Sequence, residues 1–260
     1  HSVGGQSWLA TSGNTPANWP LNLNVKRRTV WSYIFEEGIA PVLVGEFGGK
    51  FGWNNDGTAS GDGNAPFERV WLNNLIDHMN GDFEGDGFSN LTGNQVGMSY
   101  AYWSFNANSG DTGGLLIDNA TWSPVFQEKL DLLDPLLNPI PMQTQTTAKA
   151  LGYLTADGSI LFDSDGGQRQ IRATSWDGFQ FSNMILSGLW EGGRNFKSVI
   201  DQMASGVNVP IGDGINTLVI PISGDIFVTN ATPPGSAVGA TSNPELQGLT
   251  CLEVLDEIVD

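Results

Sequence analysis

The chain has 260 residues, with 11 basic and 28 acidic side chains and a net charge of −17 at pH 7. This charge repels nucleic acid and anionic membranes and argues against both as partners, but it leaves a neutral polymer such as a polysaccharide unaffected. No apolar run of about 18 residues is present to span a bilayer. The single cysteine, Cys251, excludes an internal disulfide and a multi-cysteine metal site. Apolar residues make up 40% of the chain, enough for one large α/β domain or two small ones.

The first clear pattern in chain order is a helix followed by a strand. Residues 25–37 have apolar side chains at positions 25, 30, 33 and 34, and Gly38 follows as a natural stop, which predicts a helix. Residues 41–46 form an apolar run that is typical of a strand buried on both faces in a parallel sheet. The run ends in Glu46, which lies between glycines at the expected carboxyl end of that strand.

The same alternation continues to residue 137. After a loop rich in glycine and asparagine, Pro66 opens a helix with apolar residues at 67, 70, 71, 75 and 79. Residues 96–105 are aromatic and β-rich, which predicts a second buried strand. Another helix is expected to start at Ser123 and to end at Pro135.

A connector separates this part from a second one. Residues 138–150 have no periodicity and are rich in proline, threonine and glutamine, which suits a linker. The second part is expected to begin with a hairpin whose turn lies at 165–167 and to continue into a strand end near Trp176. The elements expected after it are a helix over 195–205, a strand over 216–223, and a final helix that starts with a capping box of Thr250 and Glu253.

Glu46 is the first candidate for a catalytic residue. A carboxylate at the carboxyl end of a buried parallel strand is costly to place there, and this end of the strands is where barrel enzymes carry their chemistry. A surface glutamate that begins a loop is the alternative interpretation.

The loop 81–90 is a weaker candidate for a metal site. Its acidic residues Asp82, Glu84 and Asp86 alternate before Gly87 in the manner of a calcium loop. The twelfth position counted from Asp82 is Gly93, where a calcium loop carries a bidentate glutamate. We therefore favour a solvated acidic loop and predict no metal.

Three motifs, GEFG, YWSFNANSGDTGGLL and GLW, resemble those of glycoside hydrolase family 5, a family of secreted endoglucanases with an eight-stranded (β/α)8 TIM barrel. Nearly the whole chain takes part, but the order is the reverse of the family's. Residues 1–137 resemble the carboxyl-terminal part of such a barrel, from the end of the sixth strand to the eighth helix. Residues 138–151 form a linker, and residues 152–260 resemble the amino-terminal part, with its hairpin and first two strands.

The resemblance therefore implies an incomplete α/β barrel with segments in permuted order. The two explanations are a window cut across tandem catalytic domains and a circular permutation. We favour the tandem window, because both chain ends look cut from a larger structure and the third to sixth strands are missing. In either case the eighth and first strands of a closed barrel are neighbours, so these segments are expected to pack side by side.

By the same resemblance, Glu46 matches the nucleophile of a retaining glycosidase, which attacks the anomeric carbon. The family's general acid lies in an Asn-Glu-Pro motif on the fourth strand, and no such tripeptide occurs in this chain. An arginine of the second strand, which keeps the nucleophile ionised, is replaced by Val219. The isolated chain is therefore expected to lack its general acid and to be inactive alone.

Other residues are implied in substrate binding. Trp103 matches the tryptophan that stacks under the sugar next to the scissile bond. His1 matches the histidine of an HxY motif, although Val3 replaces the tyrosine. The remaining candidates lie in the loops after the eighth and first strands: Asn106, Ser109, Asp111, Trp176 and Phe179.

The function expected from these observations is hydrolysis of a β-1,4-glucan by a secreted, cofactor-free enzyme that acts on a polysaccharide. A non-catalytic carbohydrate-binding unit and an inactive gene fragment are the alternatives. The sequence leaves the oligomeric state and the choice among cellulose, mannan, xyloglucan and mixed-linkage glucan open.

Overall fold

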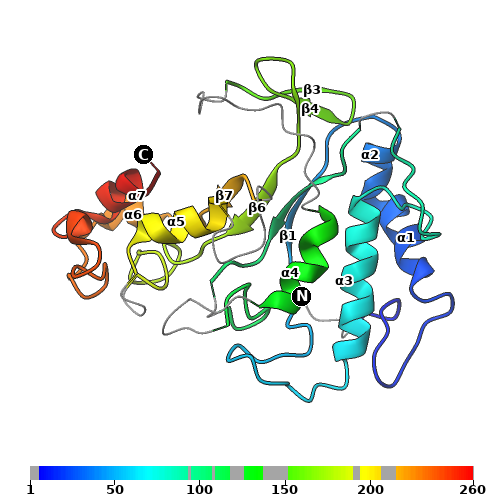
Figure 1. The fold of residues 1–260 in the computed structure, drawn as a ribbon, viewed down its shortest axis with the longest axis horizontal. Coiled ribbons are helices and arrows are strands. Elements are labelled where there is room, and N and C mark those ends of the chain that lie inside the picture. The colour runs from blue at the N-terminus through cyan, green and yellow to red at the C-terminus, as the bar shows by residue number, and fades with distance from the viewer. Residues whose placement is uncertain are drawn as a thin grey trace.

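A computed structural model describes residues 6–92, 95–106, 109–117, 126–136, 152–189, 194–205 and 215–259. Within these ranges the chain is a mixed α/β protein, and its centre is a four-stranded parallel sheet with the order β1-β2-β6-β7 (Figure 1). The strands are β1 (Leu43–Phe47), β2 (Ser99–Tyr102), β6 (Arg172–Ser175) and β7 (Thr217–Val219). The expected α/β class with a parallel sheet is confirmed.

The middle of the sheet joins the two parts of the chain. Strand β2 pairs with β6 in parallel, with Tyr100 opposite Arg172. The segments on either side of the expected linker therefore lie side by side, as the resemblance predicts. On the other side of β2, its pairing with β1 shifts register between Val44 and Phe47.

Strand β1 differs from the expectation of a strand buried on both faces. Among the described residues it pairs with β2 alone, so it forms one edge of the sheet, and Leu43 is 52% exposed. The apolar run 41–46 predicts a strand correctly, but its burial depends on a second neighbour, and none pairs with it within the described ranges. Strand β7 forms the opposite edge.

The first helical segment begins earlier than expected. It consists of α1 (Leu21–Arg27), the π-helical turn η1 (Arg28–Ser32) and α2 (Tyr33–Glu36). Val25 and Val30 are exposed, whereas Leu23 and Phe35 are buried. The buried face therefore differs from the apolar positions read from the sequence. Val25 is exposed before the π turn begins, and the π turn, which takes more residues per turn, shifts only the side chains that follow it.

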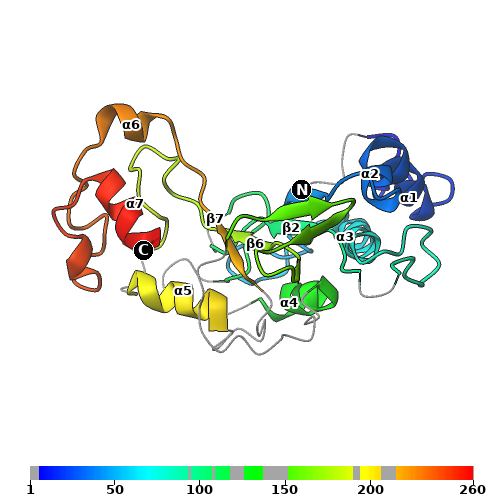
Figure 2. The same ribbon diagram turned by 90° about the horizontal axis from the view of Figure 1, so that it is seen from above.

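The long helix α3 (Ala65–Met79) agrees with the expectation and buries Leu72, Leu75, Ile76 and Met79. Helix α4 (Gln127–Leu133) is followed by the 3-10 turn η2 (Asp134–Leu136). The helices α1, α2 and α3 lie together on the β1 side of the molecule, and α5 to α7 lie beyond β7 (Figures 1 and 2).

The second part of the chain contains the expected hairpin, which is part of a small antiparallel sheet of β3 (Thr155–Asp157), β4 (Ile160–Phe162) and β5 (Gln168–Arg169). Helices α5 (Phe196–Ser205) and α7 (Cys251–Val259) are also as expected. The short helix α6 (Asp225–Thr229) and the 3-10 turn η3 (Pro244–Leu246) have no counterpart in the sequence prediction.

The capping box of α7 is present. The Thr250 N–H donates to Glu253 Oε2 at 2.8 Å, and the Glu253 N–H donates to Thr250 Oγ1 at 3.4 Å. These two bonds satisfy donors at the helix start that have no partner within the helix.

The core contains large aromatic side chains from the sheet. Phe47 contacts Tyr100 and Tyr102 edge to face, with ring centroids 6.0 and 5.4 Å apart, and Trp176 is fully buried in the same cluster. No helix in the described ranges is long and apolar enough to cross a membrane.

Candidate active site

Glu46 and Trp103 stand at the carboxyl ends of neighbouring parallel strands. Phe47 lies opposite Tyr102 in the register, and the Trp103 N–H donates to the Phe47 carbonyl at 2.8 Å. The register of β1 against β2 shifts between Val44 and Phe47, so Gly45 and Glu46 are both exposed just before the buried Phe47. Glu46 is exposed and Trp103 is half-buried, so both are reachable from solvent.

The glycines after Glu46 allow a close approach of two backbones. A Cβ built on Gly48 would overlap the carbonyl oxygen of Trp103 and would lie 3.2 Å from Thr112 Cγ2. At Gly49 a Cβ would lie 2.7 Å from Glu68 Oε1. The Gly-Glu-Phe-Gly pattern is therefore explained in part by space, since a side chain at position 48 would push the Trp103 segment away.

The loop after Trp103 closes on itself. The Leu115 N–H donates to the Ser104 carbonyl at 2.9 Å, and the Gly113 N–H donates to the Ser109 carbonyl at 2.9 Å. The Ser109 hydroxyl donates to Asp111 Oδ1 at 2.7 Å and lies 2.8 Å from the hydroxyl of Thr112. Of the predicted site residues in this loop, Ser109 is therefore buried and shapes the turn, whereas Asp111 is exposed.

Asn106 is fully buried and bonds to a residue that the sequence did not mark. Its Nδ2 donates to Asp177 Oδ1 at 2.7 Å, and Asp177 follows directly after Trp176 beyond the end of β6. Burial raises the pKa of Asp177, and the hydrogen bond from Asn106 opposes that rise. The pair links the loops after β2 and β6, at the same end of the sheet as Glu46 and Trp103.

Trp176 and Phe179 are fully buried, and the Trp176 indole N–H donates to the Ser187 carbonyl at 2.9 Å. Both belong to the aromatic core at the end of β6. His1, together with Val3, lies outside the described residues. The structure therefore brings Glu46, Trp103, Asn106 and the loop residues 109–115 to one end of the sheet.

A hollow of about 500 Å³ lies beside the free edge of β1. Its walls are mainly apolar and include Trp8, Trp31 and Trp71, and Glu46 is among its lining residues. The hollow lies between β1 and the helices α1 and α3, and Trp103 is not among its lining residues.

Two charged residues close to the site, Lys129 and Glu68, were not predicted from the sequence as parts of it. Lys129 of α4 is 1% exposed, and its Nζ donates to the carbonyls of Thr112 at 2.6 Å and Gly114 at 2.9 Å. Burial lowers the pKa of Lys129 to about 7, while the Glu68 carboxylate opposes this fall. Burial likewise raises the pKa of Glu68, which accepts the N–H of Phe51.

One signal in the sequence was available for Lys129. It lies three positions after Phe126 and four before Leu133, so helical spacing places it on their apolar face. Glu68 has no comparable signal, because an acidic residue in the first turn of a helix is common at the surface.

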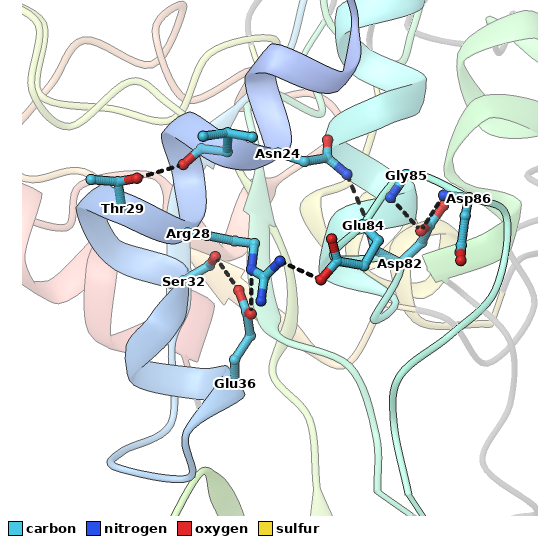
Figure 3. Close-up of polar contacts among 10 residues, drawn as sticks. Asn24, Arg28, Thr29, Ser32, Glu36, Asp82, Glu84, Gly85 and Asp86 are labelled. Carbon is cyan, nitrogen blue, oxygen red and sulfur yellow. Dashed lines mark hydrogen bonds and ion pairs between the residues drawn. The ribbon is translucent and has the colours of Figure 1, made fainter.

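The loop 81–90 holds its own shape with an acidic side chain. The Asp82 carboxylate accepts the N–H groups of Gly85, Asp86 and Gly87 at 2.7 to 3.0 Å. Arg28 bonds to Glu84 and to Glu36, which ties this loop to α1–α2 (Figure 3). Within the described ranges, no group of three or more acidic, histidine or cysteine side chains is arranged to hold a metal.

Part of the chain is similar in sequence to endoglucanases. It is 36% identical over 148 residues to an endoglucanase of Paenibacillus polymyxa, a match that covers 57% of this chain and 30% of that protein. It is 33% identical over 122 residues to the major extracellular endoglucanase of Xanthomonas campestris pv. campestris, which covers 46% of this chain and 19% of the relative. Endoglucanase G of Acetivibrio thermocellus is 34% identical over 107 residues, with 41% and 14% covered.

Among solved structures, the catalytic domain of the Xanthomonas campestris enzyme matches with 28% identity and a TM-score of 0.35, covering 41% of this chain and 28% of that chain. No model of a known protein family matches. The chain spans less than a third of the length of the three sequence relatives. The matched part is therefore related to cellulase-type glycoside hydrolases, and what the whole protein does is a separate question.

Proposed function

We propose that this chain is part of an endo-acting β-1,4-glucan hydrolase that works by a retaining mechanism, with Glu46 as the nucleophile. The observation that carries the proposal is the position of Glu46 and Trp103 at the carboxyl ends of paired parallel strands, in a chain whose sequence relatives are endoglucanases. An exposed carboxylate beside a half-buried indole provides the two functions needed at a glycosidic bond, which are attack on the anomeric carbon and a flat surface for the sugar.

The proposed architecture is an incomplete (β/α)8 barrel. Residues 1–137 would supply its final strands, residues 138–151 a linker, and residues 152–260 its first strands. The parallel pair β2–β6 supports this order, because it corresponds to the eighth strand of a barrel beside its first. The two free edges, β1 and β7, are where the remaining strands would pair.

In the proposed reaction, Glu46 attacks the anomeric carbon and forms a glycosyl ester while the bond to the leaving oxygen breaks. The departing oxygen takes a proton from a second carboxyl group, about 5 to 5.5 Å from the first in retaining enzymes. Water then cleaves the ester and releases the sugar. The chain contains no Asn-Glu-Pro motif, so the proton donor would come from a barrel strand outside these 260 residues.

Trp103 would stack under the sugar next to the cleaved bond. Asp111 is exposed in the loop that follows, where it could accept hydrogen bonds from sugar hydroxyls. Asn106 and Ser109 would act by shaping this loop, because their side chains are buried and already bonded within the protein. His1 remains a proposed sugar ligand by resemblance, and Trp176 and Phe179 would support the site from the core.

The nucleophile can be tested without the general acid. A 2-fluoro cellobioside with a dinitrophenyl leaving group needs no proton for departure, so Glu46 alone should form a stable glycosyl ester. We expect the intact mass to rise by one fluoro-cellobiosyl group and peptide mapping to place it on Glu46. Glu46→Gln should abolish labelling, because an amide is a far weaker nucleophile.

The matched control is Glu37→Gln, which removes an exposed carboxylate before β1 and should leave labelling unchanged. Label on another residue, or label that persists in Glu46→Gln, would reject Glu46 as the nucleophile.

The secreted location proposed from the relatives would be tested separately by the presence of an export signal in the complete protein.

A non-catalytic carbohydrate-binding unit is the second candidate. It is favoured by Val219, an exposed apolar residue of β7 at the position where the family carries the arginine that keeps the nucleophile ionised. Such a unit would bind cello-oligosaccharides, lose that binding in Trp103→Ala, and take no label at Glu46. Labelling at Glu46 would exclude it.

A further inference from the structure

Lys129 occupies an unusual environment for a lysine. It is 1% exposed, and its Nζ lies 4.9 Å from the centre of the Phe126 ring. Lysine is almost never fully buried unless it is paired, because removing its charge from water is costly. The two hydrogen bonds to the carbonyls of Thr112 and Gly114 offset this cost.

The carbonyls that Lys129 binds belong to the loop that closes on Trp103. The neighbouring Leu115 N–H bonds to the Ser104 carbonyl, one residue after the indole. The Thr112 methyl group also lies where Gly48 and the Trp103 carbonyl approach each other. A change in the hydrogen bonds of Lys129 Nζ therefore affects the backbone at Trp103 in two ways. One is the hydrogen bond between Leu115 and Ser104, and the other is the packing of the Thr112 methyl group beside Gly48.

Lys129 also faces the loop after β1. Glu68 of α3 interacts electrostatically with Lys129 and accepts the N–H of Phe51. Lys50 is the other charged group that acts on Lys129. The ammonium thus lies where the loops that follow the Glu46 strand and the Trp103 strand come together.

We propose that Lys129 is a positioning residue for the candidate sugar site, which holds the 109–115 loop against Trp103 and so fixes the orientation of the indole. The proposal rests on the function proposed above for Trp103. It adds a residue on α4 that does not touch the sugar and acts through the Thr112 and Gly114 carbonyls.

A pH dependence follows from this geometry. An ammonium donates stronger hydrogen bonds than a neutral amine. Because burial lowers the pKa of Lys129 to about 7, the loop is held by a charged donor below that pH and by a neutral one above it. Sugar binding should therefore weaken as the pH rises through about 7.

The experiment measures binding of a β-1,4-linked glucose hexasaccharide by calorimetry between about pH 5.5 and 9, on the full chain. Lys129→Met keeps the side-chain length but removes the donors, and should raise Kd about tenfold below pH 7 and flatten its pH profile. Lys129→Arg keeps a charged donor and should restore tight binding without the change near pH 7. The control Lys197→Met alters an exposed lysine of α5 and should behave like the wild type.

Trp103→Ala separates this inference from the proposed function. If Trp103→Ala binds as tightly as the wild type, the proposed sugar site is wrong. If Trp103→Ala loses binding while Lys129→Met retains the wild-type Kd and pH profile, the positioning role of Lys129 is wrong.

An NMR titration of the wild type needs neither a ligand nor a folded variant. We expect the Cε resonance of Lys129 and the indole N–H resonance of Trp103 to shift with one common midpoint near pH 7. An indole resonance that stays fixed while Lys129 titrates would overturn the proposal.

Discussion

Gly48 lies where the backbone after β1 passes against the carbonyl of Trp103, and a Cβ there would overlap that oxygen. The overlapping atom belongs to the backbone of Trp103, which is hydrogen-bonded to Phe47 at the end of the β1–β2 pair, so it cannot move aside as a flexible side chain would. Gly48→Ala should therefore lower the free energy of unfolding by about 2 to 4 kcal/mol. Urea denaturation followed by circular dichroism measures this change.

Gly45→Ala is the matched control for that substitution. Gly45 lies within β1, three positions before Gly48, and a Cβ there has no heavy atom within 4 Å. It should cost less than about 0.5 kcal/mol. Equal losses at both positions would show that the strand tolerates no side chain at either glycine and would remove the close approach as the cause.

Helix α3 carries a buried histidine on its inner face. His78 is fully buried and contacts the rings of Trp31 and Phe83 edge to face. Neither ring nitrogen has a hydrogen-bond partner among the described residues. Burial, together with the nearby charges of Arg27 and Arg28, lowers the pKa of His78 from 6.5 to about 3.

The low pKa of His78 predicts that acid destabilises the packing of α3. Between pH 6.5 and about 3 the unfolded chain binds a proton at His78 that the folded chain does not, so the free energy of unfolding falls as the pH falls through this range. His78→Phe keeps the ring contacts and removes the titration. At about pH 4.5 it should be more stable than the wild type by about 2 kcal/mol, with little difference near pH 7.5. Parallel stability curves for the two proteins would disprove it.

The helices show which elements the sequence specifies. The apolar spacing in α3 and α5 predicts both helices, because their buried positions follow one regular period. The apolar face predicted for residues 25–37 was wrong, since Val25 and Val30 are exposed and Phe35 is buried, and a π turn over Arg28–Ser32 interrupts the regular period of the residues after Arg27. No propensity rule marks such a turn, which is set by packing against other elements.

The candidate site likewise contains some residues that the sequence predicts and others that only the tertiary structure reveals. Glu46 and Trp103 could be placed from strand ends, since parallel strands bring their carboxyl ends together. Glu68 and Asp177 could not, because charged residues are normally at the surface and the environment of these two depends on loops distant in sequence. The tertiary structure also decides that Asn106 bonds within the protein rather than facing the open side.

At the scale of the whole molecule, the parallel sheet has two edges without a partner strand among the described residues, and each carries an exposed apolar residue, Leu43 on β1 and Val219 on β7. Such edges can pair with another chain. We expect the protein to self-associate in about 1 M salt, where its net charge of −17 is screened. Leu43→Lys should reduce this association with less than about 1 kcal/mol loss of stability, as measured by sedimentation velocity.

Val25→Lys is the control for that substitution. It makes the same change of charge at an apolar residue that is 66% exposed on α1, away from the sheet edge. Association reduced equally by both variants would point to general surface charge, and association unaffected by Leu43→Lys would exclude the β1 edge.

The pairing of β2 with β6 also bears on how the chain reaches its folded state. The residues that meet there, such as Tyr102 and Thr174, are 72 positions apart. Ordering the chain between them carries an entropic cost that nearby contacts do not share, and non-local pairings of this kind slow folding. The encounter of the two segments is thus expected to be a late step, and two separate polypeptides that carry one segment each could assemble the sheet when mixed.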